Sequence, residues 1–200
     1  MDTLIDRFIP DPDFVEVRDL GIEAVPEEVL AAIKQADLKD PVIATLFAVR
    51  DLPNRVARRL GVGAGRDAAE LSFSNIPDAG PGWVLLGERP GRELVLGAVG
   101  RFWKRDYGAR IVSPGEFVAF DEPGYLKLAV SSRVRPLGYD QSVLHYEARV
   151  EATDGEARRQ FVRYWKVIGP GNDVIVRRAL QRIKAEAEWR ECLTGALSER

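Results

Sequence analysis

Apolar and polar residues alternate with a two-residue period in several segments of the chain, beginning with DFVEVRDLGIEA near the N-terminus. This period is typical of β-strands, whose successive side chains point to opposite faces. WVLLGERPGRELVLGAVGRFW predicts two strands joined by a tight turn at residues 89–91. EFVAFDEPGYLKLAVSSRVRPLG predicts a second hairpin with its turn at residues 122–124, and QSVLHYEARVEA predicts one further strand. The pattern therefore predicts an antiparallel sheet.

The later strands of this sheet indicate one face toward a core and one toward solvent. In the strand after the second turn, one face carries Leu126, Leu128, Val130, Ser132 and Val134, and the other carries Tyr125, Lys127, Ser131, Arg133 and Arg135. In the next strand, one face carries Leu144, Tyr146, Ala148 and Val150, and the other carries His145, Glu147, Arg149 and Glu151. A dry face opposite a wet face is typical of antiparallel sheets covered on one side.

Helical spacing replaces this alternation in three other segments. PEEVLAAIKQAD has Pro26 at the first helical position and two acidic residues in the first turn, which predicts a short helix. VIATLFAVRDL, after Pro41, predicts a second one. Thr153 and Glu156 have the spacing of a capping box, so a C-terminal helix is expected to begin near Asp154.

The predicted C-terminal helix contains Gly-Pro-Gly-Asn at residues 169–172. Its apolar stripe comprises Phe161, Trp165 and Ile168 before this sequence, and Val176, Ala179, Ile183 and Ala187 after it. The stripe resumes in phase, which favours one helical axis bent at Pro170. Two helices with a short break would cover the same face. The bend either follows the curvature of the sheet or acts as a gate.

The order of these elements predicts an α+β fold in which a curved antiparallel sheet packs against helices. It resembles the helix-grip fold of the SRPBCC superfamily, the START-like and birch-pollen-allergen-like proteins. The resemblance rests on ERPGRELVLGAVGRFW, EPGYLKLAVSSRVRPLG, LHYEARVEATD and RYWKVIGPGNDVIVRRALQRIKAEAE, the last of which looks like bacterial members. The chain has one clear strand fewer than the commonest seven, and GARIV at residues 108–112 is the candidate for another.

The length and the extent of the resemblance predict a single domain over residues 1–200, with a core at about 13–189 and flexible ends at 1–12 and 190–200. The resemblance implies an apolar cavity between the sheet and the C-terminal helix, which would bind a hydrophobic small molecule or a lipid. The residues expected to line it are Leu96, Phe102, Leu128, Val130, Ser132, Leu144, Tyr146, Trp165 and Ile168.

Two other functions remain open, because a fold does not determine function. One is an enzyme of the polyketide cyclase or hydratase type, with Tyr146 as the acid and a carboxylate such as Glu88 as the base. The other is an interaction module whose cavity is filled by side chains. Ser132 and Tyr146 stand out among the expected lining residues, since binding pockets are mainly apolar with a few placed polar groups.

The net charge of −2 gives no reason to expect a nucleic-acid partner. The segment GRFWKRDYGAR mixes aromatic and basic residues, yet the strand assignment there favours packing of Phe102 or Trp103. An alternative hypothesis is that Arg101, Lys104 or Arg110 contacts a charged group of the ligand at the mouth of the cavity.

Few residues of the chain suit metal or nucleophilic chemistry. With one cysteine, Cys192, and one histidine, His145, the chain is expected to bind no metal and no cofactor. His145 is expected to be a cross-strand partner on the wet face rather than a general base paired with the carboxylate of Glu147. The glycine-rich sequence GVGAGRD at residues 61–67 lacks the lysine of a phosphate-binding loop. It is therefore predicted to belong to a flexible loop over residues 61–82.

The N-terminal sequence MDTLIDRFIPDPDF lacks the features of a signal peptide, and no apolar run reaches the roughly 18 residues of a membrane span. A cytoplasmic protein without stable membrane insertion is therefore expected. The edges of an antiparallel sheet leave a route to a homodimer.

Overall fold

The computed structural model describes residues 3–35, 82–104 and 107–198. The helix predicted after Pro41 and the glycine-rich residues 61–67 lie outside these ranges. Within them, no helix is long and apolar enough to cross a membrane.

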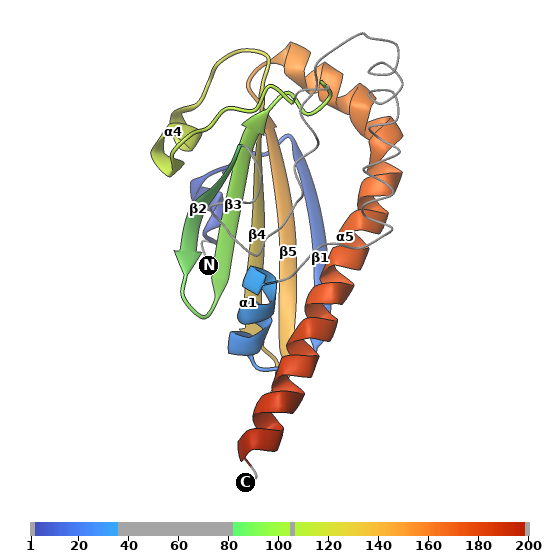
Figure 1. Cartoon of the computed structure of the whole chain (residues 1–200). Helices are drawn as coiled ribbons and strands as arrows, with labels where there is room; N and C mark the ends of the chain where they lie inside the picture. Colours follow the sequence, from blue (N-terminus) through green and yellow to red (C-terminus); the bar gives the residue numbers. More distant parts are fainter. Residues whose placement is uncertain (1–2, 36–81, 105–106, 199–200) are drawn as a thin grey trace, which may run out of the picture.

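Five antiparallel strands form a sheet in the order β1-β5-β4-β3-β2 (Figure 1). The strands are β1 (Phe14–Ile22), β2 (Trp83–Arg89), β3 (Glu93–Gly100), β4 (Leu126–Pro136) and β5 (Ser142–Ala152). The helices are η1 (Ile5–Arg7), α1 (Pro26–Gln35), α4 (Pro114–Ala119) and α5 (Gly155–Ser198). The predicted turn at residues 89–91 is confirmed, with Gly91 at a φ of 71° that glycine adopts without steric cost. The arrangement confirms the α+β helix-grip fold.

The long helix α5 begins where the sequence predicts it, but its cap differs from the prediction. Asp154 is the capping residue, since its Oδ1 accepts a hydrogen bond from the Ala157 amide at 2.7 Å. Thr153 Oγ1 instead donates to the Tyr125 carbonyl oxygen at 3.1 Å. The capping box predicted at Thr153 and Glu156 is therefore wrong, because the Thr153 side chain fixes the start of β4 rather than the helix end.

A single α-helix runs through residues 169–172, so the alternative of two helices is wrong. Its first half curves around the upper end of the sheet, and the remainder runs down beside β1 and past α1 (Figure 1). The apolar stripe keeps its phase as predicted, because Phe161, Val176, Ile183 and Ala187 are all buried. Proline inside a helix removes one backbone hydrogen bond, which accounts for curvature in this part.

In the second predicted hairpin, the second strand is confirmed as β4, but the first strand is wrong. Residues 114–119 form helix α4, whose capping box joins Ser113 and Glu116. The Glu116 amide donates to Ser113 Oγ at 3.3 Å, and the Ser113 amide donates to Glu116 Oε2 at 2.7 Å. With Pro114 at the first helical position, this local capping overrides the apolar alternation. The segment 108–112 forms no strand either, and only one bridge joins Arg110 to Val99.

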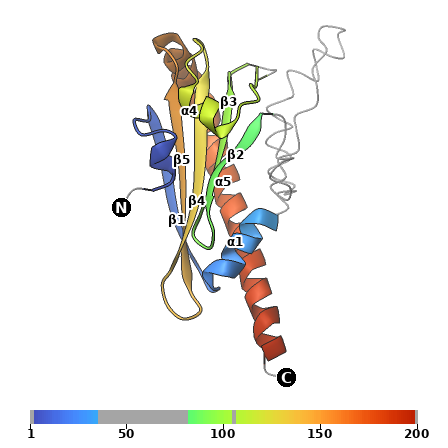
Figure 2. The same cartoon turned by 90° about the vertical axis from the view of Figure 1, so that its left-hand side faces the viewer.

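The outer face is also covered over β2, β3 and part of β4, while β1 keeps Val15 and Val17 exposed, so the prediction of one wholly wet face is wrong. The inner face packs against α1 and α5, and Figure 2 shows η1 on the opposite, outer side. An outer cluster covers that side and contains Leu4, Ile5, Ile9, Leu86, Val95, Val99, Phe117, Tyr125 and Ala129. Lys127 and Ser131 are consequently buried rather than solvated.

The N-terminal residues, expected at a flexible end, are fixed to this outer face. The Leu4 amide donates to both carboxylate oxygens of Glu93 at 3.1 Å, and Ser131 Oγ donates to Glu93 Oε1 at 2.9 Å. Arg149 Nη2 lies 2.8 Å from Asp6 Oδ1. Because buried charges are stable only when paired or hydrogen-bonded, these contacts join the segment before β1 to the sheet.

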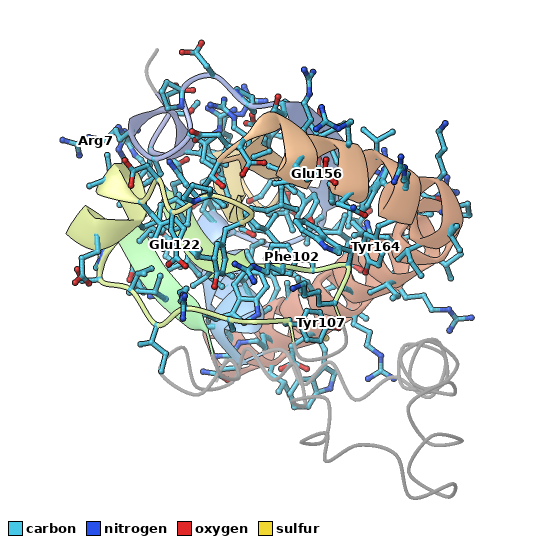
Figure 3. The ribbon with its side chains drawn as sticks, turned by 90° about the horizontal axis from the view of Figure 1, so that it is seen from above. Arg7, Phe102, Tyr107, Glu122, Glu156 and Tyr164 are labelled. Atoms are coloured by element: carbon cyan, nitrogen blue, oxygen red, sulfur yellow. The ribbon has the colours of Figure 1, made fainter. Side chains whose placement is uncertain are left out.

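Two apolar clusters cover the ends of the inner face. The lower cluster joins α1 and α5 to the sheet and includes Val29, Leu30, Ile33, Leu94, Val134, Leu144, Val176, Leu180 and Ile183. The upper cluster surrounds the start of α5 and includes Phe14, Phe102, Trp103, Leu126, Val150, Phe161, Tyr164 and Trp165. Figure 3 looks down on this end, where Phe102 and Tyr164 lie near the start of α5.

Candidate functional site

Polar residues occupy the inner face between the two apolar clusters. Residues paired directly across antiparallel strands lie side by side on the same face. One such row runs across four strands through Arg18, Tyr146, Ser132 and Leu94. The next row runs through Glu16, Ala148, Val130 and Leu96. The register thus places Arg18, Tyr146 and Ser132 beside one another, with Glu16 one row away.

Helix α5 adds two polar side chains, directly after its Gly-Pro-Gly sequence. Asn172 Nδ2 donates to Glu16 Oε2 at 3.1 Å, and Arg18 Nη2 donates to Asp173 Oδ1 at 2.5 Å. Glycine and proline are the weakest helix formers, so contacts outside the helix help to keep this segment helical. We call Glu16, Arg18, Tyr146, Asn172 and Asp173 the inner polar cluster.

Two carboxylates converge on the guanidinium group of Arg18. Its Nη2 lies 2.5 Å from Asp173 Oδ1 and 3.1 Å from Glu16 Oε1. The other oxygen of Asp173 lies 3.0 Å from Arg177 Nη2. The inner polar cluster itself therefore carries one more negative than positive charge when both carboxylates are ionised.

Several polar atoms of this cluster lack hydrogen-bond partners among the described residues. Glu16 Oε1 and Arg18 Nε are both buried without a hydrogen bond. Glu16 Oε1 lies within ion-pair distance of Arg18 Nη2, but the contact lacks hydrogen-bond alignment. The Tyr146 hydroxyl forms no hydrogen bond with the described parts of the chain either. Since buried polar atoms are nearly always paired, Glu16 Oε1 and Arg18 Nε mark a candidate binding site, with the Tyr146 hydroxyl on the neighbouring strand.

The surroundings shift the pKa values of this cluster in different directions. Burial raises the pKa of Glu16, with Arg18 opposing and Asp173 adding to the shift. Burial also acts on Asp173, but hydrogen bonds from Arg18 and Arg177 outweigh it and lower the pKa of that carboxyl. Burial, and then the charge of Glu16, raises the pKa of the Tyr146 hydroxyl, which stays protonated at neutral pH. Two neighbouring carboxyl groups thus differ in proton affinity.

The nine expected lining residues fall into four places. Leu144 lies in the lower cluster, which Tyr146 borders, while Phe102 and Trp165 pack in the upper cluster. Leu96, Leu128, Val130 and Ser132 lie between the clusters on the inner face, and Ile168 lies half-buried on α5. Leu128 and Val130 are half-buried and pack against neither cluster. Contact of these nine residues with a ligand stays a prediction.

Sequence reasoning missed Glu16, Arg18, Asn172 and Asp173. The signal for the first two lies in FVEVRDL, where an acid and a base share one strand face with Phe14 and with apolar residues further along. An oppositely charged pair inside an apolar row indicates a partner within the fold.

The carboxylate beside Tyr146 is Glu16, so the role predicted for Glu88 is wrong. Glu88 lies in β2, three strands from β5, and therefore roughly 14 Å away at the usual strand spacing. Its Oε1 lies 2.5 Å from Lys34 Nζ in α1.

The basic residues after β3 lie away from the inner polar cluster. Arg101 and Arg110 place their guanidinium carbons 4.1 and 5.0 Å from the centre of the Tyr125 ring, which belongs to the outer cluster. Arg110 also pairs with Glu122 at 2.7 Å. These two arginines therefore lie over a residue of the outer cluster, and contact of Arg101, Lys104 or Arg110 with a charged ligand group stays a prediction.

The remaining chemistry-bearing residues lie outside the inner polar cluster. His145 Nδ1 lies 2.7 Å from Asp19 Oδ1 across the strand pair, which confirms its cross-strand role. Cys192 is exposed on α5. Across residues 3–35, 82–104 and 107–198, no group of three or more His, Cys, Asp or Glu residues could hold a metal ion.

Comparison with known proteins gives only distant similarities. No family model matches the chain, and no curated protein matches it. A norcoclaurine synthase point mutant from Thalictrum flavum is 11% identical, with a TM-score of 0.39 over 87% of this chain and 93% of that one. A conserved protein from Geobacillus kaustophilus is 12% identical, with a TM-score of 0.37 over 87% and 95%. A protein from Arthrobacter aurescens is 13% identical, with a TM-score of 0.39 over 93% and 89%.

Likeness at this level supports no statement about activity or ligand. The helix-grip fold rests on the strand order and on the position of α5 against the inner face. Membership of the SRPBCC superfamily stays a prediction from the sequence.

Proposed function

We propose that this protein binds an apolar small molecule between the inner face of the sheet and α5, and holds its polar end at the inner polar cluster. The observation that carries the proposal is the set of unpaired polar atoms on Glu16, Arg18 and Tyr146 between two apolar clusters. Binding sites for small molecules combine apolar walls with a few polar groups that fix orientation.

The apolar part of the ligand would contact the row next to this cluster. Leu128 and Val130 are half-buried and pack against neither cluster, so their side chains offer apolar surface on the inner face. Val130 lies in the same row as Glu16, two strands away, and Leu128 lies in the next row of β4. A molecule lying across β4 and β5 would reach the inner polar cluster with one end and Leu128 with the other.

A second candidate function is proton transfer to or from the same ligand, with Glu16 in place of Glu88. The observation that favours it is the opposite direction of the pKa shifts of Glu16 and Asp173 within one cluster. Carboxyl groups held at different proton affinities are typical of acid–base catalysis. Any turnover of a bound molecule would then be lost in Glu16→Gln and reduced in Tyr146→Phe.

Native mass spectrometry of protein purified without detergent tests the binding proposal. We expect a reproducible added mass that disappears on unfolding in organic solvent, together with uptake of the neutral fluorophore N-phenyl-1-naphthylamine by the stripped protein. A bare polypeptide mass combined with no uptake would refute binding and favour a filled interior, as in an interaction module.

A further inference from the structure

The two unpaired atoms on β1 are one hydrogen-bond acceptor and one donor. Glu16 Oε2 is occupied by Asn172, which leaves Oε1 as a buried acceptor. Arg18 uses Nη2 for Asp173 and Nη1 for the Val17 carbonyl oxygen, which leaves Nε as a buried donor. Residues two apart on a strand share a face, with about 6.6 Å between their Cα atoms. One small group that both donates and accepts would complement both atoms.

The charges near these two atoms disfavour an anionic group. Arg18 Nη2 is already shared by Glu16 and Asp173, so a ligand carboxylate would approach two negative charges around one guanidinium group. Burial already disfavours the ionised form of Glu16, and a third carboxylate would increase that cost. An ammonium group is disfavoured for another reason, since it carries only donors and would leave Arg18 Nε without an acceptor.

We infer that the polar end of the ligand is an uncharged hydroxyl group, which donates to Glu16 Oε1 and accepts from Arg18 Nε. The Tyr146 hydroxyl, protonated at neutral pH, supplies a further donor from the neighbouring strand. The ligand class is therefore an apolar alcohol or phenol rather than a fatty acid or an alkylamine. This inference rests on the proposed function, since it names the ligand class of the same site.

Three decyl compounds with different head groups test this assignment on the full chain. Decan-1-ol, decanoate and decylamine would each displace N-phenyl-1-naphthylamine at pH 7.5, below their aggregation concentrations. We expect decan-1-ol to act at roughly tenfold lower concentration than the other two, since leaving a charged or polar group unpaired costs about 1–3 kcal/mol. In Glu16→Gln, decanoate should displace the fluorophore at a lower concentration than in the unaltered protein. The preference for decan-1-ol over decanoate should then fall to about twofold or less.

The outcomes separate this inference from the proposed function. Displacement by decanoate at the same or a lower concentration than decan-1-ol in the unaltered protein would overturn the hydroxyl assignment alone. No binding of the fluorophore or of any decyl compound would refute the proposed function and the assignment together. Should Glu16→Gln fail to fold by circular dichroism, Asp173→Asn removes the second carboxylate and must shift the same ratio in the same direction.

Discussion

Arg18 Nη2 in the edge strand β1 lies 2.5 Å from Asp173 Oδ1 in α5, although 155 residues separate the two in the sequence. The contact joins the first strand of the sheet to the helix that covers it. It lies directly after the Gly-Pro-Gly sequence, where the helix has the least stability of its own. The same arginine also contacts Glu16, so one side chain links the fold to the candidate site.

A double-mutant cycle with Arg18→Met and Asp173→Asn measures this link. The side chains of Arg18 and Asp173 are 37% and 32% exposed, respectively. Ion pairs that water can reach contribute little to stability. We expect a coupling free energy of about 0.2–1 kcal/mol in urea unfolding. A coupling of zero within error would mean that the contact does not hold α5 to β1.

The two carboxyl groups of the cluster should affect stability with opposite dependence on pH. The folded protein raises the pKa of Glu16, so the folded state keeps this proton longer and stability falls as pH rises from about 4.3 through the folded pKa. The folded protein lowers the pKa of Asp173, so its contribution is present above about pH 3.9 and is lost as pH falls through the folded pKa.

The variants Glu16→Gln and Asp173→Asn separate these two effects. Urea unfolding between about pH 3 and pH 7 should show Glu16→Gln gaining stability relative to the unaltered protein as pH rises. Asp173→Asn should lose relative stability over the same rise. Parallel curves for the two variants would contradict the opposite pKa shifts.

Gly169 and Gly171 make a matched pair for testing the continuity of α5. A Cβ at residue 171 would meet nothing within 4 Å, whereas a Cβ at residue 169 would lie 3.3 Å from Trp165 Nε1. We expect Gly171→Ala to stabilise the protein by about 0.5–1 kcal/mol, since alanine loses less entropy in a helix. Gly169→Ala should increase the stability of the protein by less than Gly171→Ala does. A destabilising Gly171→Ala would show that this residue is not helical in solution.

Glu93 should be required for stability through the N-terminal segment it holds. Its side chain is 1% exposed and accepts hydrogen bonds from the Leu4 amide and Ser131 Oγ. Glu93→Ala leaves both donors buried and unpaired, which should cost about 2–4 kcal/mol in urea unfolding. Glu88→Ala on the same hairpin removes only the partly exposed pair with Lys34 and should cost less than about 1 kcal/mol. Equal effects would contradict the buried role of Glu93.

The sequence predicted the strands and helices whose apolar period is long and regular. The stripe from Phe161 to Ala187 predicted a helix that passes through Pro170 in phase, and the structure contains it. It could not show that residues 114–119 form a helix, because one capping box of Ser113 and Glu116 overrides a short apolar alternation. Local capping competes with periodicity most strongly in segments of this length.

The site was harder to predict than the fold because it depends on contacts across the whole chain. Tyr146 was identified from its place in an apolar row, which a single strand reveals. Its charged neighbour Glu16 became evident only from the pairing of β1 with β5. Likewise, the outer face was predicted to be wet because nothing in a strand indicates that Ile5 and Phe117, from distant segments, cover it.

Uptake of N-phenyl-1-naphthylamine by Leu128→Trp tests whether a ligand binds between the inner face of the sheet and α5. Leu128 is half-buried on the inner face and belongs to neither cluster, and Val17→Trp places the same bulk at an exposed residue on the outer face of β1. We expect Leu128→Trp to abolish uptake and to cost less than about 1 kcal/mol of stability, below the usual cost of overpacking a tight core. Val17→Trp should bind like the unaltered protein. Full uptake by a folded Leu128→Trp variant would contradict binding between the sheet and α5.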